Sequence, residues 1–296
     1  MSPQLPHLRR KKTPTLLASV NPTELKSIRG VCLDIDDTLS TEGKLEAEAY
    51  SALWKLKQAG LVVVPITGRP AGWCDHFARF WPIDAIVGEN GAFTFFMERD
   101  PSSSPHKEKS TRFVRKKILT PSGSDEATLK TKLSQLALLI QQKFPHAQWA
   151  SDQPYREFDL AIDICEDVPT WDQKDVKTLL SLCHQQGAHA KLSSIHVNTW
   201  FGKYDKRTGF ENWLNQGAPG CSLRPIPQLD EWLYIGDSPN DEPMFEWFPL
   251  SVGVANIKQY LEQLNHPPLW ITDQPSGAGF VQMTELLLKA RAKKLE

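Results

Sequence analysis

Two aspartates spaced two residues apart follow an apolar run near the start of the chain. The run, residues 31–33, leads into Asp34, Asp36 and Thr38. Carboxylates this close repel each other, so a bound cation, a shared proton or both must hold them together. Mg²⁺ prefers oxygen ligands of this kind and commonly serves phosphate chemistry. The pattern indicates a magnesium and phosphate site, and an ordinary acidic turn is the alternative that these residues alone leave open.

Two further apolar runs end in residues that could join this site. Residues 61–66 lead into Thr67, and residues 233–235 lead through Gly236 into Asp237. The carboxyl ends of parallel strands lie at one edge of a sheet, where open α/β sheets place their ligands. Carboxylates, one hydroxyl and a nearby lysine could transfer a phosphoryl group through an aspartyl-phosphate. One carboxylate would attack phosphorus and another would handle the proton of the leaving group.

Four segments of the chain resemble, in order, the four motifs of the haloacid-dehalogenase-like phosphatase superfamily. They are Asp34 to Thr38, Thr67 to Arg69, Tyr204 to Lys206 and Gly236 to Asp241. The long stretch between the second and third motifs resembles the type IIB cap branch, which includes sugar-phosphate phosphatases and phosphomannomutase. The resemblance covers the chain from about residue 30 to its end. One such motif is a weak signal, but four in order around a cap are a specific one.

The resemblance implies a role for each residue that matches a motif. Asp34 would be the nucleophile that becomes phosphorylated, and Asp36 would protonate the leaving oxygen and then activate water. Thr67 would hydrogen-bond the phosphoryl oxygens, and Lys206 would pair with them and with Asp34. Lys203 competes for this cationic role, but Lys206 follows Asp205 at an expected helix start, as in the family motif.

The resemblance also implies Mg²⁺ as the cofactor. The metal would sit on Asp34, on the backbone carbonyl of Asp36 and on Asp237. Asn240 and Asp241 would support it through water or hydrogen bonds. The sequence departs from the family pattern after Asp36, where it has aspartate and many relatives carry glycine. That position tolerates variation, so the departure puts little in doubt.

Polar residues near the core loops and in the cap are candidates for substrate binding. Besides Thr67 and Lys206 they are Gly68, Arg69, Asn90, Arg156, Ser194, His196 and Asn240. Arg69 and Asn90 fit a substrate contact and a purely structural turn equally well. Arg156 and the strand face of Ser194 and His196 could bind sugar hydroxyls or a second anion, and a hydrated strand face is the alternative.

The elements that position these residues alternate as in a parallel sheet. Strand-like and helix-like stretches follow one another over residues 26–91 and again over 200–296, which is typical of βαβ units. Between them, residues 92–199 predict a hairpin, helices at about 124–144 and 172–186, and a strand at 158–164 with one wet face. We expect an α/β fold with a Rossmann-like parallel-sheet core and an inserted α/β (α+β) cap domain. Residues 1–25, rich in proline and polar groups, predict a flexible tail.

Composition excludes several classes of protein. The 296 residues carry a net charge of -1, which argues against nucleic acid as a partner. No apolar run approaches 18 residues, so no membrane span is expected. Five cysteines without a C-x-x-C pair are typical of reduced thiols in a cytoplasmic protein. Oligomeric state stays open.

These observations predict a Mg²⁺-dependent phosphomonoester hydrolase that acts on a small soluble phosphate such as a sugar phosphate. A phosphomutase of the same fold is the nearest alternative. A phospho-receiver signalling module also uses aspartate, threonine and lysine around Mg²⁺. In a receiver the paired acids come on the first strand and the phosphorylated aspartate on a later one, so the order here disfavours it. Specificity in such folds lies in the cap, which the motifs do not cover.

Overall fold

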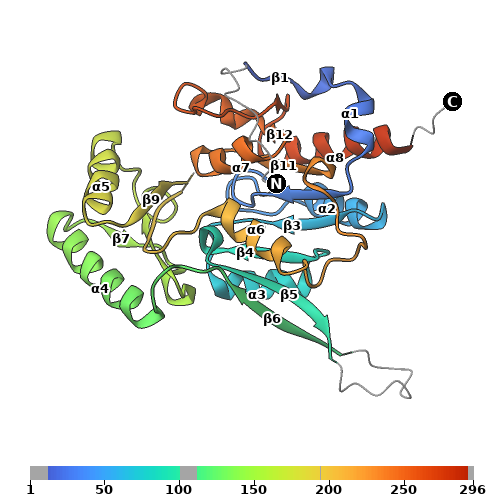
Figure 1. Ribbon diagram of the computed structural model, residues 1–296. Coiled ribbons are helices and arrows are strands. Elements are labelled where there is room, and N and C mark those ends of the chain that lie inside the picture. The colour runs from blue at the N-terminus through green and yellow to red at the C-terminus, as the bar shows by residue number, and fades with distance from the viewer. Residues whose placement is uncertain (1–12, 101–111, 194, 293–296) are drawn as a thin grey trace, which may run out of the picture.

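A six-stranded sheet forms the centre of the molecule. The computed structural model describes residues 13–100, 112–193 and 195–292 (Figure 1). In spatial order the strands are β1 (Thr15–Leu16), β13 (Trp270–Ile271), β12 (Leu250–Gly253), β11 (Trp232–Gly236), β2 (Gly30–Leu33) and β3 (Val62–Pro65). All neighbouring strands pair in parallel. The three strands β2, β3 and β11 are buried along their whole length, which explains their continuous apolar sequence.

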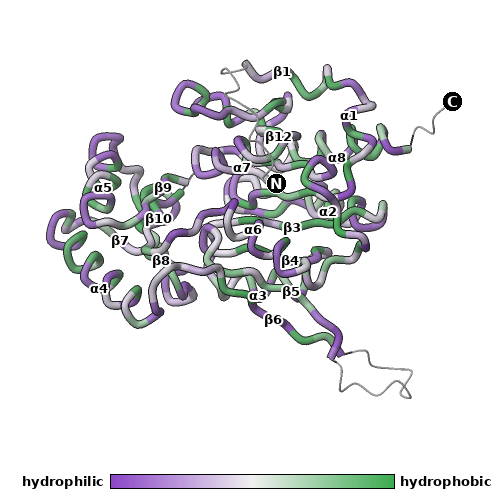
Figure 2. The backbone as a smooth tube through the Cα atoms, viewed as in Figure 1, coloured by the Kyte–Doolittle hydropathy of each residue, from purple (hydrophilic) through white to green (hydrophobic). Residues whose placement is uncertain are grey.

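Helices cover both faces of this sheet, and successive residues of one strand serve opposite faces. Val31 and Leu33 pack with the helices α1 (Pro22–Lys26), α2 (Ala47–Gln58) and α8 (Ser276–Ala292). Cys32, between them, packs with α6 (Lys206–Asn215) and α7 (Glu242–Trp247). The apolar strands at the centre of Figure 2 are therefore enclosed on both sides. Within the described residues, no helix combines the length and the apolarity that a membrane span requires.

The chain before the first motif is partly built into the core. Strand β1 pairs with β13, and Leu17 and Leu25 are fully buried beneath α8. The prediction of a flexible tail over residues 1–25 is therefore wrong for residues 13–25. These few buried leucines show no helical or strand periodicity among the prolines and polar residues, so the sequence carried little signal for their burial. Residues 1–12 lie outside the described part of the chain.

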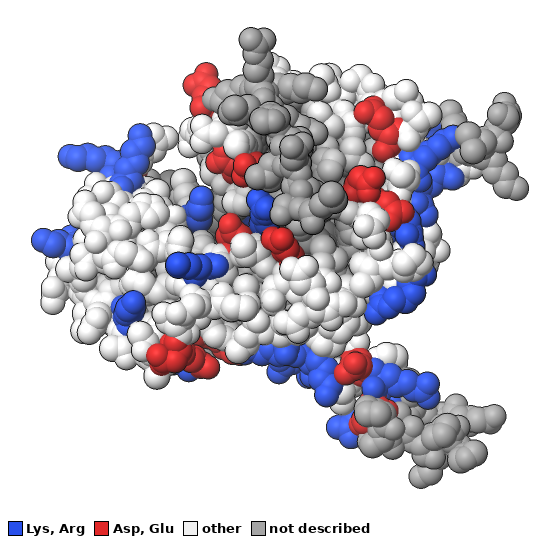
Figure 3. Space-filling model, viewed as in Figure 1, with Lys and Arg blue, Asp and Glu red and all other residues white. Residues whose placement is uncertain are grey.

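A three-stranded antiparallel sheet extends the core. It contains β4 (Ala85–Gly88), β5 (Phe93–Arg99) and β6 (Phe113–Leu119), and a single parallel bridge between Ile66 and Val87 links it to the end of β3. The predicted hairpin is thus present as β5 and β6, and helix α3 (Ala71–Phe80) packs on β4 and β5. Lys and Arg side chains gather along this hairpin (Figure 3). Because β5 pairs with a core strand, the start of the cap at residue 92 remains a proposal.

The remaining insertion has its own antiparallel sheet and two helices. The strand order is β7 (Gln148–Trp149), β8 (Asp159–Asp163), β10 (His196–Trp200) and β9 (His189–Leu192), with α4 (Glu126–Lys143) and α5 (Gln173–Gln185) on one face. The polar face of β8 was expected to be wet, but Asp159 and Asp163 are at most 2% exposed. Neighbouring side chains and core loops cover this face, so the prediction of a hydrated face is wrong. We refer to this part, residues 124–200, as the cap.

Candidate active site

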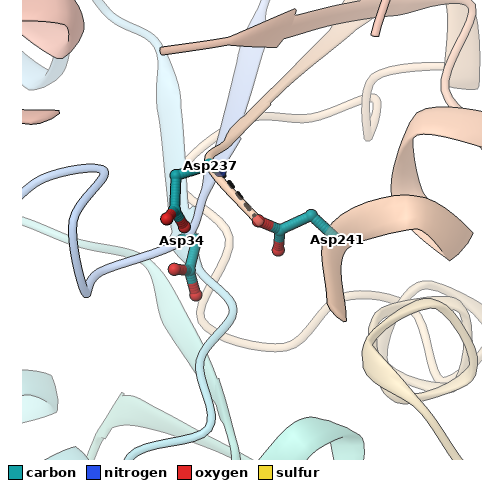
Figure 4. Close-up of side chains that lie close together, drawn as sticks. All are labelled: Asp34, Asp237 and Asp241. Atoms are coloured by element: carbon teal, nitrogen blue, oxygen red, sulfur yellow. Dashed lines mark hydrogen bonds between the residues drawn. The ribbon is translucent and has the colours of Figure 1, made fainter. Parts of the chain in front are cut away.

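Three aspartates meet at the carboxyl edge of the central sheet. Asp34 follows β2 and Asp237 follows the adjacent strand β11. Asp241 ends the short helix η5 (Pro239–Asp241) in the loop after β11. One oxygen of each carboxylate lies within 4.8 Å of an oxygen of the other two. Figure 4 shows the three side chains close together. The structure therefore brings together residues that are about 200 positions apart in the sequence.

Lys206 supplies the positive charge of this cluster. Its Nζ donates to Asp34 Oδ1 at 2.7 Å and to Asp241 Oδ1 at 2.6 Å, and its side chain is 1% exposed. Burial alone would lower the pKa of Lys206, but the two carboxylates raise it above its ordinary value, so the side chain is an ammonium ion. Lys203, the competing candidate, is exposed to solvent. Position on the fold therefore favours Lys206.

Local backbone features place Lys206 in the site. Asp205 caps helix α6 in a capping box with Thr208, so the helix begins at Lys206. Gly91 lies against this helix start with a φ of +109°, and a Cβ there would stand 1.9 Å from the carbonyl oxygen of Asp205. Only glycine allows this close approach between the loop after β4 and the start of α6.

Asp241 is braced by four donors and supports the site instead of holding a ligand directly. Its Oδ1 accepts from Lys206 and from the Tyr234 hydroxyl at 2.5 Å. Its Oδ2 accepts the backbone N–H groups of Asp237 at 2.9 Å and Ser238 at 3.2 Å. These donors fill the oxygens of the carboxylate. This geometry favours the supporting role for Asp241 over a direct bond to the metal.

Asp34 and Asp237 keep oxygens available for a cation. Burial raises the pKa of Asp34 to about 8, and the nearby Asp241 and Asp36 add to this effect. The positive charge of Lys206 acts in the opposite direction but does not cancel it. Burial and Asp241 raise the pKa of Asp237 well above its usual range. Thr38 and Asn256 donate to Asp237 only at 3.4 and 3.3 Å. Two buried carboxylates with raised pKa values match what a hard divalent cation would stabilise, so the donor set fits Mg²⁺.

Asp36 lies at the entrance of the site and is bound by Arg69. Arg69 Nε is 2.9 and 3.1 Å from the two oxygens of Asp36, and Arg69 Nη2 is 2.8 Å from Oδ1. The same guanidinium contacts Asp152 and Glu166 of the cap. Thr67 is fully buried, and its hydroxyl oxygen accepts the N–H of Arg69 at 3.0 Å, which leaves the hydroxyl proton to donate.

A small pocket between the core and the cap joins most of the sequence-predicted residues. Its core side is lined by Asp34, Asp36, Gly68, Arg69, Ser238 and Asn240, and its cap side by Arg156, Ser193, Ile195, His196 and Asn198. Ser194 lies outside the described residues. Asn90 does not line the pocket but is buried behind Gly68, where a Cβ would stand 3.2 Å from Asn90 Nδ2.

Arg156 joins the cap to the core and has few donors left for a substrate. It donates to Asp152 at 2.9 and 3.0 Å, to Asp159 at 3.0 Å and to the carbonyl oxygen of Gly68 at 2.8 Å. Four of its five N–H donors are thus used. The interpretation of Arg156 as a contact for a second substrate anion is therefore not supported, because two carboxylates already neutralise its charge.

Glu89 is a structural residue of the site that the sequence analysis did not single out. Its buried carboxylate accepts backbone N–H groups from Ala71 at the start of α3 and from Glu157, Phe158 and Asp159 at the start of β8. Burial raises the pKa of Glu89 to about 8. The residue ties the core to the cap, and its donors are 18 to 70 residues away, so no local pattern could have identified it.

Comparisons with known proteins agree with this architecture. Residues 31–114 match the family model of haloacid dehalogenase-like hydrolases. Among curated proteins, none matches the chain. A protein from Thermoplasma acidophilum has a similar structure, with a TM-score of 0.62 at 19% identity over 88% of this chain and 98% of that one. A HAD/COF-like hydrolase from Plasmodium vivax gives a TM-score of 0.63 at 16% identity over 91% and 99% of the two chains.

A sucrose-phosphatase from Synechocystis, solved in complex with sucrose and phosphate, shares the fold as well. Its TM-score is 0.58 at 13% identity, over 88% of this chain and 98% of that one. At such identities the likeness concerns the fold. The predicted α/β class with a Rossmann-like core and an inserted second sheet is confirmed, and so is the resemblance that the four motifs predicted.

Proposed function

We propose that this chain, whose residues 31–114 match the haloacid dehalogenase-like hydrolases, is a Mg²⁺-dependent phosphomonoester hydrolase that works through an aspartyl-phosphate. The observation that carries the proposal is the buried pair of Asp34 and Lys206, 2.7 Å apart, of which Asp34 lines one pocket together with Asp36. A carboxylate held by an ammonium ion at the bottom of a small pocket is suited to attack a phosphoryl group.

In the first step an oxygen of Asp34 attacks phosphorus, and the bond between phosphorus and the leaving oxygen breaks. Asp36 gives its carboxyl proton to that oxygen, so a neutral alcohol leaves. Lys206 offsets the negative charge of the phosphoryl oxygens, and the hydroxyl proton of Thr67 is free to donate to one of them. The product of this step is phosphorylated Asp34.

In the second step water attacks the phosphorus of phosphorylated Asp34. Asp36, now a carboxylate, takes the proton from water as the new bond forms. The bond between phosphorus and the Asp34 oxygen breaks, and phosphate and the free Asp34 carboxylate are released. Asp36 regains its proton, so both residues return to their starting forms.

The residues that would hold Mg²⁺ are Asp34, Asp237 and the backbone carbonyl of Asp36. When bound, the cation would supply positive charge that stabilises the phosphoryl oxygens and holds the carboxylates in place. Asn240, whose Oδ1 accepts from Ser238 at 2.9 Å, and Asp241 would support this arrangement through hydrogen bonds. The proposal follows from the buried oxygen donors of this chain.

Replacing Asp237 with alanine is expected to raise the Mg²⁺ concentration for half-maximal activity by about tenfold or more. The variant loses one of the few oxygen ligands that the chain offers. The measurement is phosphate release over a Mg²⁺ titration. EDTA should abolish the activity of the unmodified protein, and added Mg²⁺ should restore that activity. Full activity in EDTA would mean that the acidic cluster is not a metal site.

A small polar phosphate ester is the substrate class that the pocket supports best, and a sugar phosphate is our proposal. The cap side of the pocket presents His196, Asn198 and Ser193, which can exchange hydrogen bonds with hydroxyl groups. The sucrose-phosphatase and a trehalose-6-phosphate phosphatase related protein share the fold. Both names concern sugar phosphates, which supports this class without identifying the ester.

A panel of phosphomonoesters with Mg²⁺, scored by released phosphate, tests the proposal. Sugar phosphates, nucleotides, a phosphoglycerate and p-nitrophenyl phosphate would be compared at equal concentration. Parallel analysis of the sugar phosphates distinguishes hydrolysis from the phosphomutase alternative, since a mutase returns an isomer and little free phosphate. Absence of turnover with every ester would contradict a phosphatase function.

Replacing His196 with alanine is expected to lower kcat/KM for the best sugar phosphate by roughly 10–100-fold, as for one or two lost polar contacts. The loss on p-nitrophenyl phosphate should be slight, because this ester carries no sugar hydroxyls. Steady-state kinetics on both esters gives the comparison. Equal losses would show that His196 supports the fold or the chemistry and does not select the substrate.

The cellular setting remains a proposal drawn from composition. Cys32, Cys74, Cys183 and Cys221 form no disulfide within the described part of the chain, which agrees with the reducing compartment that the cytoplasm provides. We propose a cytoplasmic protein whose partner is its small phosphorylated substrate, with no nucleic-acid or membrane partner.

A further inference from the structure

The guanidinium of Arg69 is shared between the core and the cap. On the core side it holds both oxygens of Asp36, at 2.9 and 3.1 Å from Nε. On the cap side Nη2 lies 3.0 Å from Glu166 and Nη1 lies 3.4 Å from Asp152. The ring of Trp73 covers one face of the guanidinium at 4.4 Å. The side chain is only 4% exposed, so it has no room to leave these partners while the cap stays in place.

Both cap partners of Arg69 are fixed to the cap and not to the core. The backbone N–H groups of Cys165, Glu166 and Asp167 all donate to the carboxylate of Asp163, the last residue of β8. Glu166 therefore moves with the cap sheet. Its Oε2 also lies 2.9 Å from His196 Nε2 on strand β10.

The side chain of Glu166 is an ionised carboxylate. The contact with His196 and the positive charge of Arg69 outweigh partial burial and lower the pKa of Glu166 to about 2. The position of the Asp152 carboxylate is fixed by Arg156, which donates to both of its oxygens. Glu166 thus shares Nη2 of Arg69 with Asp36, and Asp152 lies against Nη1, so two carboxylates of the cap hold the guanidinium.

This arrangement links the position of the cap to the position of Asp36. The guanidinium is planar and rigid, so it transmits orientation between the groups bound at its two sides. If the cap moved away, Arg69 would keep its contacts with Asp36 and Trp73 but lose the two carboxylates of the cap. The Asp36 carboxylate would then lose a fixed orientation toward the leaving oxygen.

We propose that Arg69 is a positioning residue, held by Glu166 and Asp152 of the closed cap so that it orients Asp36 toward the leaving group. The inference rests on the proposed function, in which Asp36 protonates the leaving oxygen. It replaces the sequence-based interpretation of Arg69 as a substrate contact, since its donors face carboxylates. In this scheme Glu166 acts through Arg69 and does not touch the reacting atoms.

The test compares two esters of nearly the same shape, p-nitrophenyl phosphate and phenyl phosphate. p-Nitrophenol leaves readily as an anion, whereas phenol depends much more on a proton donor. The Glu166→Gln variant keeps the shape of the side chain and removes the charge that holds Arg69. We expect kcat/KM, which reports the step in which the leaving group departs, to fall about tenfold on phenyl phosphate and less than about threefold on p-nitrophenyl phosphate. The later attack of water on phosphorylated Asp34 is the same for both esters and does not enter kcat/KM.

A double-variant cycle separates a positioning role from a structural one. In Arg69→Met, Asp36 has already lost its partner, so adding Glu166→Gln should change the ratio of the two kcat/KM values by less than about twofold. Arg69→Lys should recover part of that ratio. Asp175→Asn, on α5 with a side chain that is 42% exposed, is the matched control for a lost carboxylate and should leave the ratio unchanged. Thermal unfolding of each variant checks that it is folded.

Three results would overturn the proposal. Equal losses on both esters in Glu166→Gln would show that Glu166 supports binding or the fold. A full additional loss in the Arg69→Met background would show that Glu166 acts independently of Arg69. An unmodified protein that hydrolyses neither of these esters nor any other ester of the panel would contradict the phosphatase function itself, and the positioning role with it. The first two results require an active enzyme, so the failure of the inference can be told from the failure of the proposed function.

Discussion

The Asp34→Asn variant is expected to lose phosphatase activity by at least about a thousandfold. An amide is a poor nucleophile, and in the proposed mechanism no neighbouring residue can take over the attack on phosphorus. Asp34 is 4% exposed and lies within hydrogen-bonding distance of Lys206, so no other carboxylate can occupy its place without moving the loop after β2. Phosphate release from the best ester of the panel is the measurement.

The stability of this variant provides the control. Burial and the nearby carboxylates raise the pKa of Asp34 to about 8. Ionising this side chain therefore lowers the stability of the folded protein when no cation is bound. A neutral asparagine removes that repulsion, and Lys206 keeps Asp241 as its partner. We therefore expect the melting temperature without Mg²⁺ to be equal or higher. Retention of more than a small fraction of the activity would disprove Asp34 as the nucleophile.

The Lys206→Ala variant is expected to lose both activity and stability. Without the ammonium ion, Asp34 and Asp241 remain buried and uncompensated, which destabilises a protein by on the order of 3–5 kcal/mol. The pKa of Asp34 would rise further, because Lys206 is the charge that opposes burial there. A protonated Asp34 is a weak nucleophile, so we expect kcat to fall by about a hundredfold or more.

Lys203→Ala is the matched control for this experiment. Lys203 precedes Lys206 by three residues and is exposed, so the same change of side chain there should leave activity and unfolding nearly unchanged. Urea unfolding without Mg²⁺ and phosphate release with Mg²⁺ give the two readouts. A Lys206→Ala protein as stable and active as Lys203→Ala would show that the buried ion pairs are not needed.

Side chains whose function depends on distant partners could not be assigned from the sequence. Arg69 and Arg156 were both candidates for substrate binding, yet their donors face carboxylates of the cap. Glu166 and Glu89 carried no signal at all, since Glu166 meets Arg69 from 97 residues away and Glu89 meets its donors from up to 70 residues away. From sequence alone, a charged residue in a loop is expected to be exposed to solvent, because its neighbours in space are unknown.

What the sequence by itself determined is the order of elements and the residues at the ends of the core strands. Apolar runs that end in Asp34, Thr67 and Asp237 must become adjacent once those strands pair in parallel, because the carboxyl ends then share one edge. Only the tertiary structure decided which charges compensate which: Lys206 over Lys203, and Arg69 between Asp36 and Glu166. The physical reason is that a charge affects the free energy of folding strongly only when it is buried, and burial is a property of the packed fold.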